Sequence, residues 1–379
     1  MTSAFDRGSE VLDFGSDDGP PQDPHVVTGL ADTRLPSREE ILRVEDLTVS
    51  FPTDDGLVRA VRGVSYAVHE REVLGIVGES GSGKSVSSMA VMGLLPKSAR
   101  ITGRVHFRGE DVLTMSPRRR RGLRGRAIGM VFQDPMTALN PVRTIGDQLA
   151  ETVLSHQVMS RKQAFGRAEE MLDLVGIPQA RTRLRAYPHE FSGGMRQRVM
   201  IAMAVINRPD VIIADEPTTA LDVTVQAQIL EKLLEVKDAV GAAIILITHD
   251  LGVIAGMAHR VLVMYAGRPV EIGDTDSVFY RPRMPYTAGL LGSIPALDVA
   301  SAERLRPIKG SPPSLISLPS GCPFQPRCPL ADEVCRTSEP DLTATDDDGH
   351  RAACHHWSTL AGSDDPTAYF RTESEASTP

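Results

Sequence analysis

Eight consecutive residues decide the fold that we expect for this chain of 379 residues: Gly78-Glu79-Ser80-Gly81-Ser82-Gly83-Lys84-Ser85. They directly follow the apolar run Val73–Val77 and precede the helix-compatible run Val86–Leu95. A glycine-rich turn between a buried strand and a helix lets backbone N–H groups point at phosphate oxygens, and the helix N-terminus adds a favourable field. Lys84 is placed to reach the outer phosphates, and Ser85 is placed to bind Mg²⁺. The stretch therefore predicts a phosphate-binding loop, with all eight residues as candidate nucleotide-binding residues.

Further apolar runs of strand length follow this loop, at Val211–Ala214, Ile244–Ile247 and Val261–Met264. Their apolar residues are continuous rather than alternating, which is typical of strands covered on both faces of a parallel sheet. Leu47–Ala67 instead alternates around the turn residues Asp54-Asp55-Gly56, which favours antiparallel strands. We therefore expect an α/β fold of the phosphate-loop NTPase class with an antiparallel β subdomain.

The remaining segments differ from this core in composition. Apolar residues recur at helical spacing between Thr144 and Val175, which predicts an inserted helical subdomain over about residues 134–190. Prolines break the periodicity after about residue 278. We expect four regions: a disordered acidic arm at 1–40, the nucleotide-binding domain at 41–278, a separate loop-rich extension at 279–357, and a disordered tail at 358–379.

The charge balance and hydropathy exclude several classes of protein. The 41 basic and 49 acidic residues give a net charge of −8, which argues against binding to nucleic acid or to an anionic membrane surface. No apolar run approaches the roughly 18 residues that span a bilayer. The acidic start lacks the basic-then-apolar pattern of a secretory signal, so we expect a cytoplasmic location.

Two acids at the end of the Val211–Ala214 run complete the predicted nucleotide site. An acid at this strand end can reach the magnesium ion bound by Ser85, which is the role we assign to Asp215. Glu216, one residue further, is placed to orient or deprotonate the attacking water. A second anion-binding turn, Ser192-Gly193-Gly194, precedes a helix-compatible run. Because one nucleotide does not need two phosphate cradles on one chain, this turn is a candidate site for the nucleotide of a partner chain, and a simple N-cap turn is the alternative.

The order of these motifs resembles the ABC ATPase family over roughly residues 44–275. Phe191-Ser192-Gly193-Gly194-Met195-Arg196-Gln197 looks like the family signature, with Phe191 and Met195 in place of the usual leucine and first glutamine. The resemblance implies ATP and Mg²⁺ as ligands, and a head-to-tail dimer of two ATPase domains. It implies further roles for four residues: Gln133 as the magnesium-sensing glutamine, Asp222 in the loop that crosses the dimer, His249 as the switch histidine at the γ-phosphate, and Phe51 as the aromatic that stacks on adenine.

Several segments resemble the oligopeptide/dipeptide importer ATPases in particular: Phe132–Pro141, Tyr187–Glu190, Pro285–Thr287 and Ser293–Pro295. This resemblance implies an ATP-hydrolysing subunit of the translocase class, peripheral at the cytoplasmic face of the membrane. Its implied partners are two transmembrane permease subunits, a second ABC ATPase and, indirectly, an extracytoplasmic substrate-binding protein, with no nucleic acid. A nickel importer ATPase and a soluble non-transport ABC ATPase are the alternatives.

All four cysteines lie in the extension, at Cys322, Cys328, Cys335 and Cys354. Cytosolic thiols grouped in this way are more often metal ligands than disulfides. Four thiolates satisfy either tetrahedral zinc or a [4Fe–4S] cluster. The pattern resembles the cysteine motif that ends some peptide-importer ATPases, which implies the iron–sulfur cluster, with zinc or no metal as alternatives.

Overall fold

A computed structural model describes residues 38–219, 221–294 and 308–370. The predicted acidic arm at 1–40 lies outside these residues up to position 37, and Glu40 already belongs to the first strand. Everything below concerns the unit that starts at Ser37.

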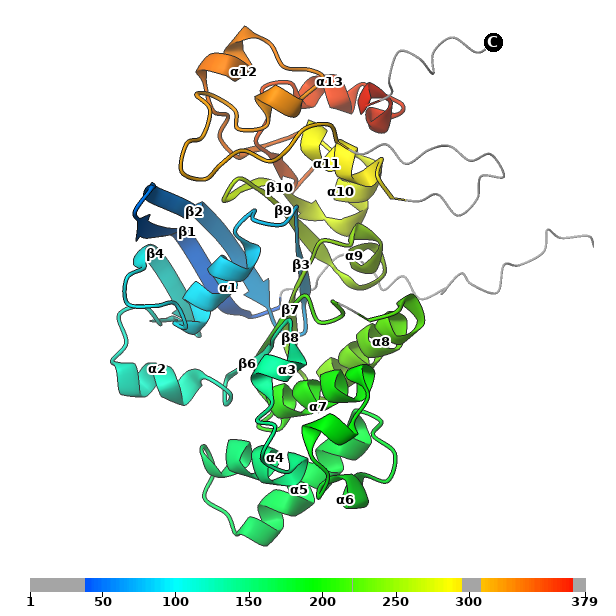
Figure 1. Cartoon of the computed structure of the whole chain (residues 1–379). Helices are drawn as coiled ribbons and strands as arrows, with labels where there is room; N and C mark the ends of the chain where they lie inside the picture. The colour runs from blue at the N-terminus through cyan, green and yellow to red at the C-terminus, as the bar shows by residue number, and fades with distance from the viewer. Residues whose placement is uncertain (1–37, 220, 295–307, 371–379) are drawn as a thin grey trace, which may run out of the picture. The chain divides into compact units, whose positions relative to one another are not determined.

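A four-stranded antiparallel sheet forms the first layer, with the strand order β2-β1-β4-β5 (Figure 1). Its strands are β1 (Glu40–Thr53), β2 (Gly56–His69), β4 (Arg100–Phe107) and β5 (Glu110–Asp111). The turn between β1 and β2 lies at the Asp54-Asp55-Gly56 signal in the sequence. The predicted antiparallel subdomain is therefore confirmed.

The second sheet has eight strands in the order β11-β12-β10-β9-β3-β8-β7-β6. Its strands are β3 (Val73–Val77), β6 (Ile128–Val131), β7 (Val211–Asp215), β8 (Ala243–Thr248), β9 (Arg260–Tyr265), β10 (Arg268–Asp274), β11 (Thr343–Ala344) and β12 (Arg351–Ala352). Five neighbouring strands pair in parallel, in the order β9, β3, β8, β7 and β6, and β10 pairs with β9 in antiparallel fashion. This arrangement confirms the predicted α/β fold.

Both faces of this sheet are covered. Along β7, Val211 and Ile213 belong to the apolar cluster shared with the antiparallel sheet, whereas Ile212 and Ala214 belong to the cluster shared with helices. All residues of β3, β7 and β8 are buried, which explains their continuous apolar runs. The helices of this core are α1 (Lys84–Met92), α2 (Pro117–Leu123), α7 (Gly193–Val205), α8 (Val223–Val240), α9 (Leu251–Met257) and α10 (Thr275–Tyr280).

A run of short helices separates β6 from β7 in the chain, where the sequence predicts the helical subdomain. It comprises α3 (Pro135–Ala138), α4 (Ile145–Leu154), α5 (Arg161–Leu174), α6 (Ala180–Arg183) and the 3₁₀ turn η1 (Pro188–Glu190). The helix α5 begins with a capping box, in which the Ser160 side chain accepts from the Gln163 backbone and the Gln163 side chain accepts in return. The apolar side chains whose spacing predicts this region are buried, among them Ile145, Leu149, Leu172 and Val175.

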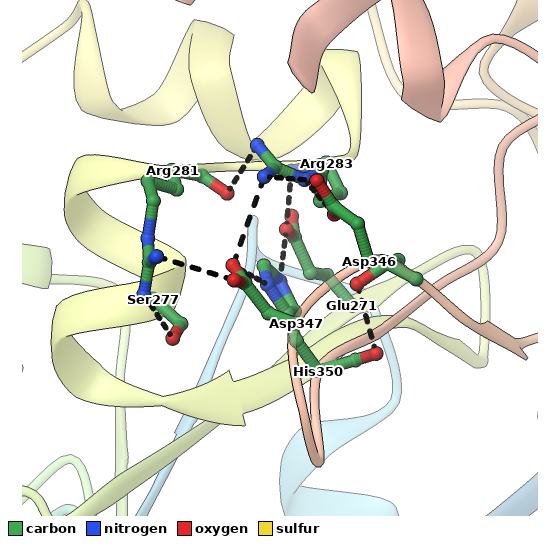
Figure 2. A network of polar contacts seen from close by, with 8 residues as sticks. Glu271, Ser277, Arg281, Arg283, Asp346, Asp347 and His350 are labelled. Atoms are coloured by element: carbon green, nitrogen blue, oxygen red, sulfur yellow. Dashed lines mark hydrogen bonds and ion pairs between the residues drawn. The ribbon is translucent and has the colours of Figure 1, made fainter.

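The extension after residue 278 packs against the core through several short elements: α11 (Pro285–Leu291), η2 (Gln325–Arg327), α12 (Glu333–Thr337), β11, β12, α13 (Trp357–Ala361) and η3 (Pro366–Phe370). Its strand β12 pairs with β10 of the core, so the large sheet continues into the extension. Figure 2 shows a polar network at this junction, in which His350 next to β12 and Arg283 both contact Glu271 on β10.

The tail is a correction to the sequence analysis. Residues 358–370 were predicted to be disordered, but the structure forms α13 and η3 there. Leu360 is buried and Phe370 packs against the main core cluster, so two apolar side chains supply the contacts that the polar composition hides. The rest of the predicted tail, residues 371–379, lies outside the described residues.

Within the described ranges, no helix is both long enough and apolar enough to cross a bilayer.

Candidate nucleotide site

The loop Gly78–Ser85 joins β3 to α1, as the sequence predicts. Its backbone needs glycine at two points of close approach. A Cβ at Gly78 would lie 2.2 Å from the Met264 carbonyl oxygen, and one at Gly83 would lie 2.3 Å from the Ala60 carbonyl oxygen. Both glycines also have positive φ, at +148° and +97°. Strand β9 and strand β2 therefore press on the loop from outside and fix its path.

Lys84 lies inside the loop, with only 4% of its surface exposed. Its Nζ donates to the carbonyl oxygens of Gly78 at 2.7 Å and Glu79 at 2.9 Å. Burial lowers the pKa of Lys84, while the carboxylates of Glu216, Asp215 and Glu79 act in the opposite direction. The ammonium group is thus held by loop carbonyls at the position where a phosphate would compete for it.

Ser85 and Asp215 meet across the strand ends, with the Ser85 Oγ donating to Asp215 Oδ1 at 2.9 Å. Asp215 ends β7 and is buried, and this burial raises its pKa, whereas the hydrogen bond from Ser85 lowers it. One hydroxyl and one carboxylate oxygen next to a phosphate cradle form a donor set that suits Mg²⁺, which keeps several waters and takes few protein ligands.

Glu216 is the centre of a second polar group. Its carboxylate accepts from Gln133 Nε2 at 3.1 Å and from Thr219 Oγ1 at 3.0 Å, and it lies 3.5 Å from His249 Nδ1. Its backbone has a φ of +45°, which is unusual for a residue other than glycine. The backbone N–H of Glu216 donates to the Ile247 carbonyl oxygen at 2.8 Å, so β8 holds this strained turn in place.

The loop residues, including Lys84 and Ser85, and the side chains of Gln133, Glu216 and His249 open on one cavity of about 720 Å³. Its lining consists of Ala60, Gly78, Glu79, Ser80, Gly81, Ser82, Gly83, Lys84, Ser85, Val86, Gln133, Glu216, His249, Leu290 and Leu315. The volume is within the range of ligand sites for molecules of cofactor size. The structure therefore brings together the loop and Glu216, which sequence analysis selected from their pattern, with Gln133 and His249, which it selected from the family resemblance.

Three other sequence-selected features lie elsewhere. Ser192 caps α7 and Asp222 caps α8, and the two helix starts are adjacent, because a Cβ at Gly194 would lie 2.8 Å from the Val225 side chain. Of the described residues that line the cavity, none comes from these two helix starts. Phe51 on β1 packs against the core of the antiparallel sheet. Their assignments to the nucleotide remain predictions.

Sequence analysis missed the residues that hold the loop from the side of the extension. Arg327 forms a two-pronged ion pair with Glu79, at 2.6 and 2.8 Å, across a sequence separation of 248 residues. The Tyr286 hydroxyl accepts from the Glu79 backbone N–H at 2.8 Å. Nothing in the local pattern around Arg327 or Tyr286 indicates such contacts.

The four cysteines gather at the extension. Cys322 and Cys335 are buried, and the Cys322 N–H donates to the Cys335 carbonyl oxygen at 2.8 Å. Burial raises the pKa of Cys328 and Cys354 to about 12, and the charges of Cys322 and Cys335 act on both in the same direction. Among the described residues, Asp332, Cys335 and His356 also place one ligand atom each within 4.8 Å of the others.

The chain matches two family descriptions, in two separate segments. Residues 61–219 match the family described as ABC transporter, and residues 270–335 match the oligopeptide/dipeptide transporter C-terminal region. Among solved structures, the dimeric ATP-binding cassette MJ0796 in a post-hydrolysis state bound to ADP and Pi is similar, with a TM-score of 0.55 and 25% identity, over 62% of this chain and 99% of that one.

Curated relatives extend the similarity over most of the chain. The dipeptide transport ATP-binding protein DppD of Bacillus subtilis is 55% identical over 318 residues, which cover 83% of this chain and 94% of the relative. The oligopeptide transport ATP-binding protein OppD of Salmonella typhimurium is 55% identical, over 79% of this chain and 89% of the relative. OppD of Mycobacterium tuberculosis is also 55% identical, but this chain spans only 53% of its length. From the shared motifs, the shared fold and these identities, the chain belongs to the ABC transporter ATP-binding proteins, in the oligopeptide/dipeptide branch that carries this C-terminal region.

Proposed function

We propose that the chain binds and hydrolyses ATP to energise an importer of dipeptides or oligopeptides. The observation that carries the proposal is that Ser85, which is hydrogen-bonded to Asp215, lines one cavity together with the phosphate-binding loop, Gln133, Glu216 and His249. A phosphate cradle, a magnesium donor set and a carboxylate for the attacking water are the parts that phosphoryl transfer to water requires.

Each part has a distinct task in the proposed reaction. The loop N–H groups and Lys84 bind the phosphates, and Ser85 and Asp215 hold Mg²⁺ when it is bound, which neutralises charge on the phosphate oxygens. Glu216 accepts a proton from the attacking water or orients it. His249 is 64% exposed, so its ring is open to a ligand in the cavity, and we assign it to the γ-phosphate. Gln133 donates to Glu216 and thereby links this carboxylate to the helical subdomain that it precedes.

A second ATPase domain completes the site in this proposal. Ser192, Gly193 and Asp222 are exposed and lie at helix starts, where backbone N–H groups favour anions. A second ABC ATPase, identical or homologous, would present these residues to the nucleotide in a head-to-tail dimer. Closure on ATP and release after hydrolysis would then be the two states that transport alternates between.

The membrane partners are proposed from exposed apolar side chains in the helical segment that follows Gln133. Met136, Val142 and Tyr187 are exposed by 53%, 79% and 39%. Arg196 donates to both Met136 Sδ at 3.2 Å and the Pro188 carbonyl oxygen at 2.8 Å, so Met136 lies beside the turn that follows Tyr187, and exposed apolar patches mark protein interaction sites. Two permease subunits would dock here at the cytoplasmic face of the membrane, with the extracytoplasmic binding protein acting through them.

The cysteine site is a further part of the proposal. A [4Fe–4S] cluster would be held by Cys322, Cys328, Cys335 and Cys354, which are all buried or half-buried free cysteines of the extension. The group formed by Asp332, Cys335 and His356 fits zinc instead. The full chain, purified without oxygen, should contain iron and acid-labile sulfide in equal amounts and absorb visible light. Zinc in place of iron would exclude the iron–sulfur cluster.

The first experiment compares wild type with Glu216→Gln after reconstitution with the neighbouring membrane subunits. Turnover should fall by about 10²-fold or more, because the carboxylate that accepts the proton is lost, while ATP binding is retained. Glu110→Gln makes the same chemical change at a side chain that is 56% exposed and should leave turnover unchanged. Undiminished turnover in Glu216→Gln would assign hydrolysis to the partner ATPase. Stimulation by nickel rather than by peptides would select the alternative cargo.

A further inference from the structure

A side chain of the cysteine-bearing segment reaches into the phosphate-binding loop. The guanidinium group of Arg327 donates to both carboxylate oxygens of Glu79, at 2.6 and 2.8 Å. Because both N–H groups donate in parallel to the two carboxylate oxygens, such a bidentate pair fixes the orientation of the carboxylate and also neutralises its charge. Arg327 directly precedes Cys328 and ends η2, so a residue of the extension contacts the second residue of the loop.

The Arg327 side chain is itself held rigidly. Only 4% of it is exposed, and it also donates to the backbone carbonyl oxygens of Lys309 at 3.1 Å and Ile308 at 3.4 Å. Its guanidinium carbon lies 5.9 Å from the ring centroids of both Tyr265 and Phe324, which adds cation–π attraction. An arginine with this many fixed partners is pre-organised and loses little further entropy in holding Glu79.

Glu79 is fixed at three points by this arrangement. Its carboxylate is held by Arg327, its backbone N–H by the Tyr286 hydroxyl, and its carbonyl oxygen accepts from Lys84 Nζ at 2.9 Å. Tyr286, like Arg327, lies after the core domain, and it is fully buried against Tyr265 and Phe324, with centroid separations of 4.6 and 5.4 Å. Two of the three points therefore belong to the segment after residue 278.

The electrostatic consequence concerns the nucleotide. Glu79 lines the cavity together with Lys84, so its carboxylate is a negative charge at the edge of a site for a polyanion. Paired with Arg327 it is neutralised, but alone it would repel phosphates and compete with them for Lys84.

We propose that Arg327 is a positioning residue for the phosphate-binding loop. Arg327 neutralises and orients Glu79 so that the loop accepts a nucleoside triphosphate. The inference rests on the proposed function, because it assigns the cavity to ATP.

The test measures the dissociation constant of a non-hydrolysable ATP analogue with Mg²⁺ by calorimetry on the full chain. Arg327→Met should raise this constant by at least about tenfold, the change that loss of one charge-assisted contact produces. Glu79→Gln should change it by less than about threefold, and the double variant Glu79→Gln/Arg327→Met should recover most of the affinity, because it has the same net charge as the wild-type pair. Arg281→Met is the matched control, since it also removes an arginine paired with the extension, at Asp347, but not at the loop.

Each outcome decides the inference. Tight binding by Arg327→Met, within about twofold of wild type, overturns it, and so does a double variant as weak as Arg327→Met, because the effect would then not pass through Glu79. A merely structural role would lower the unfolding temperature of Arg327→Met without weakening the affinity of the folded protein. If Arg327→Met does not fold, Arg327→Gln, which keeps a donor for the two carbonyl groups, replaces it with the same expected loss. Failure of the wild type to bind the analogue would instead refute the proposed function.

Discussion

Replacement of His350 by alanine should destabilise the attachment of the extension to the core. His350 and Glu271 are both fully buried, and His350 Nε2 lies 2.8 Å from Glu271 Oε1, which also accepts the Arg283 backbone N–H at 2.5 Å (Figure 2). The variant removes one of the partners of a buried carboxylate. Loss of a hydrogen bond to a charged group costs about 1.5–3 kcal/mol. The ring also packs on Gly273, where a Cβ would lie 2.9 Å from it, so its removal leaves a cavity. Together we expect a loss of about 3–5 kcal/mol.

Guanidinium unfolding followed by tryptophan fluorescence measures this loss directly. Trp357, at the start of α13, is the only tryptophan of the chain, so its signal reports on the extension. Asp348→Ala, at an exposed position two residues earlier, is the control and should change the free energy of unfolding by less than about 0.5 kcal/mol. If His350→Ala lowers the free energy of unfolding by no more than this control does, the buried Glu271 carboxylate has enough hydrogen-bond partners without the histidine, and the argument from burial is refuted.

Two further predictions concern the core. Burial lowers the pKa of His259, and the nearby charges of Lys237 and Arg38 act in the same direction, while its neutral Nδ1 accepts the Val73 N–H at 3.1 Å. Below about pH 6.5 the unfolded chain therefore binds more protons at His259 than the folded protein does. The contribution of neutral His259 to the free energy of unfolding is complete above that pH, and it is lost as the pH falls towards the pKa of the folded state. In the same fluorescence assay, His259→Asn should lose less stability than wild type between about pH 7.5 and pH 5.5, and equal losses would contradict the assignment. For packing, Gly129→Ala should cost about 1–3 kcal/mol, because its Cβ would lie 2.3 Å from the Ala204 carbonyl oxygen, whereas Gly166→Ala, with open space within 4 Å, should stabilise α5 slightly. A Gly129→Ala variant as stable as wild type would show that β6 and α7 can separate freely.

The features that sequence analysis predicted are those that short-range pattern determines. The loop Gly78–Ser85 has a strand before it and a helix after it, so its motif carries its own context. The meeting of Ser85 with Asp215 follows from strand order, because carboxyl ends of parallel strands share one edge of a sheet. The continuous runs in β7 and β8 likewise report burial on both faces.

The features that it missed depend on contacts between distant segments. Arg327 follows a proline in a segment without periodicity, and its role appears only when η2 packs beside the loop. Thr219 donates to Glu216 from the turn after β7, where a threonine has many equally plausible uses. The prediction of a disordered tail at residues 358–370 was wrong for a related reason. The average composition of this segment is polar, and it conceals the two apolar side chains that pack on the core, Leu360 and Phe370.

The same contacts make the extension part of the energetics of the nucleotide site. Tyr265 on β9, Tyr286 on α11 and Phe324 beside η2 form one aromatic cluster, with centroid separations of 4.6–5.4 Å. This cluster supports both groups that hold Glu79, namely the Tyr286 hydroxyl and the Arg327 guanidinium. Coupling between two sites is reciprocal. Under the proposed role of Arg327, an ordered segment around Cys322 and Cys328 favours the loop conformation that binds ATP. Bound ATP then favours the ordered segment by the same factor. Arg327 is the residue whose loss would uncouple the two.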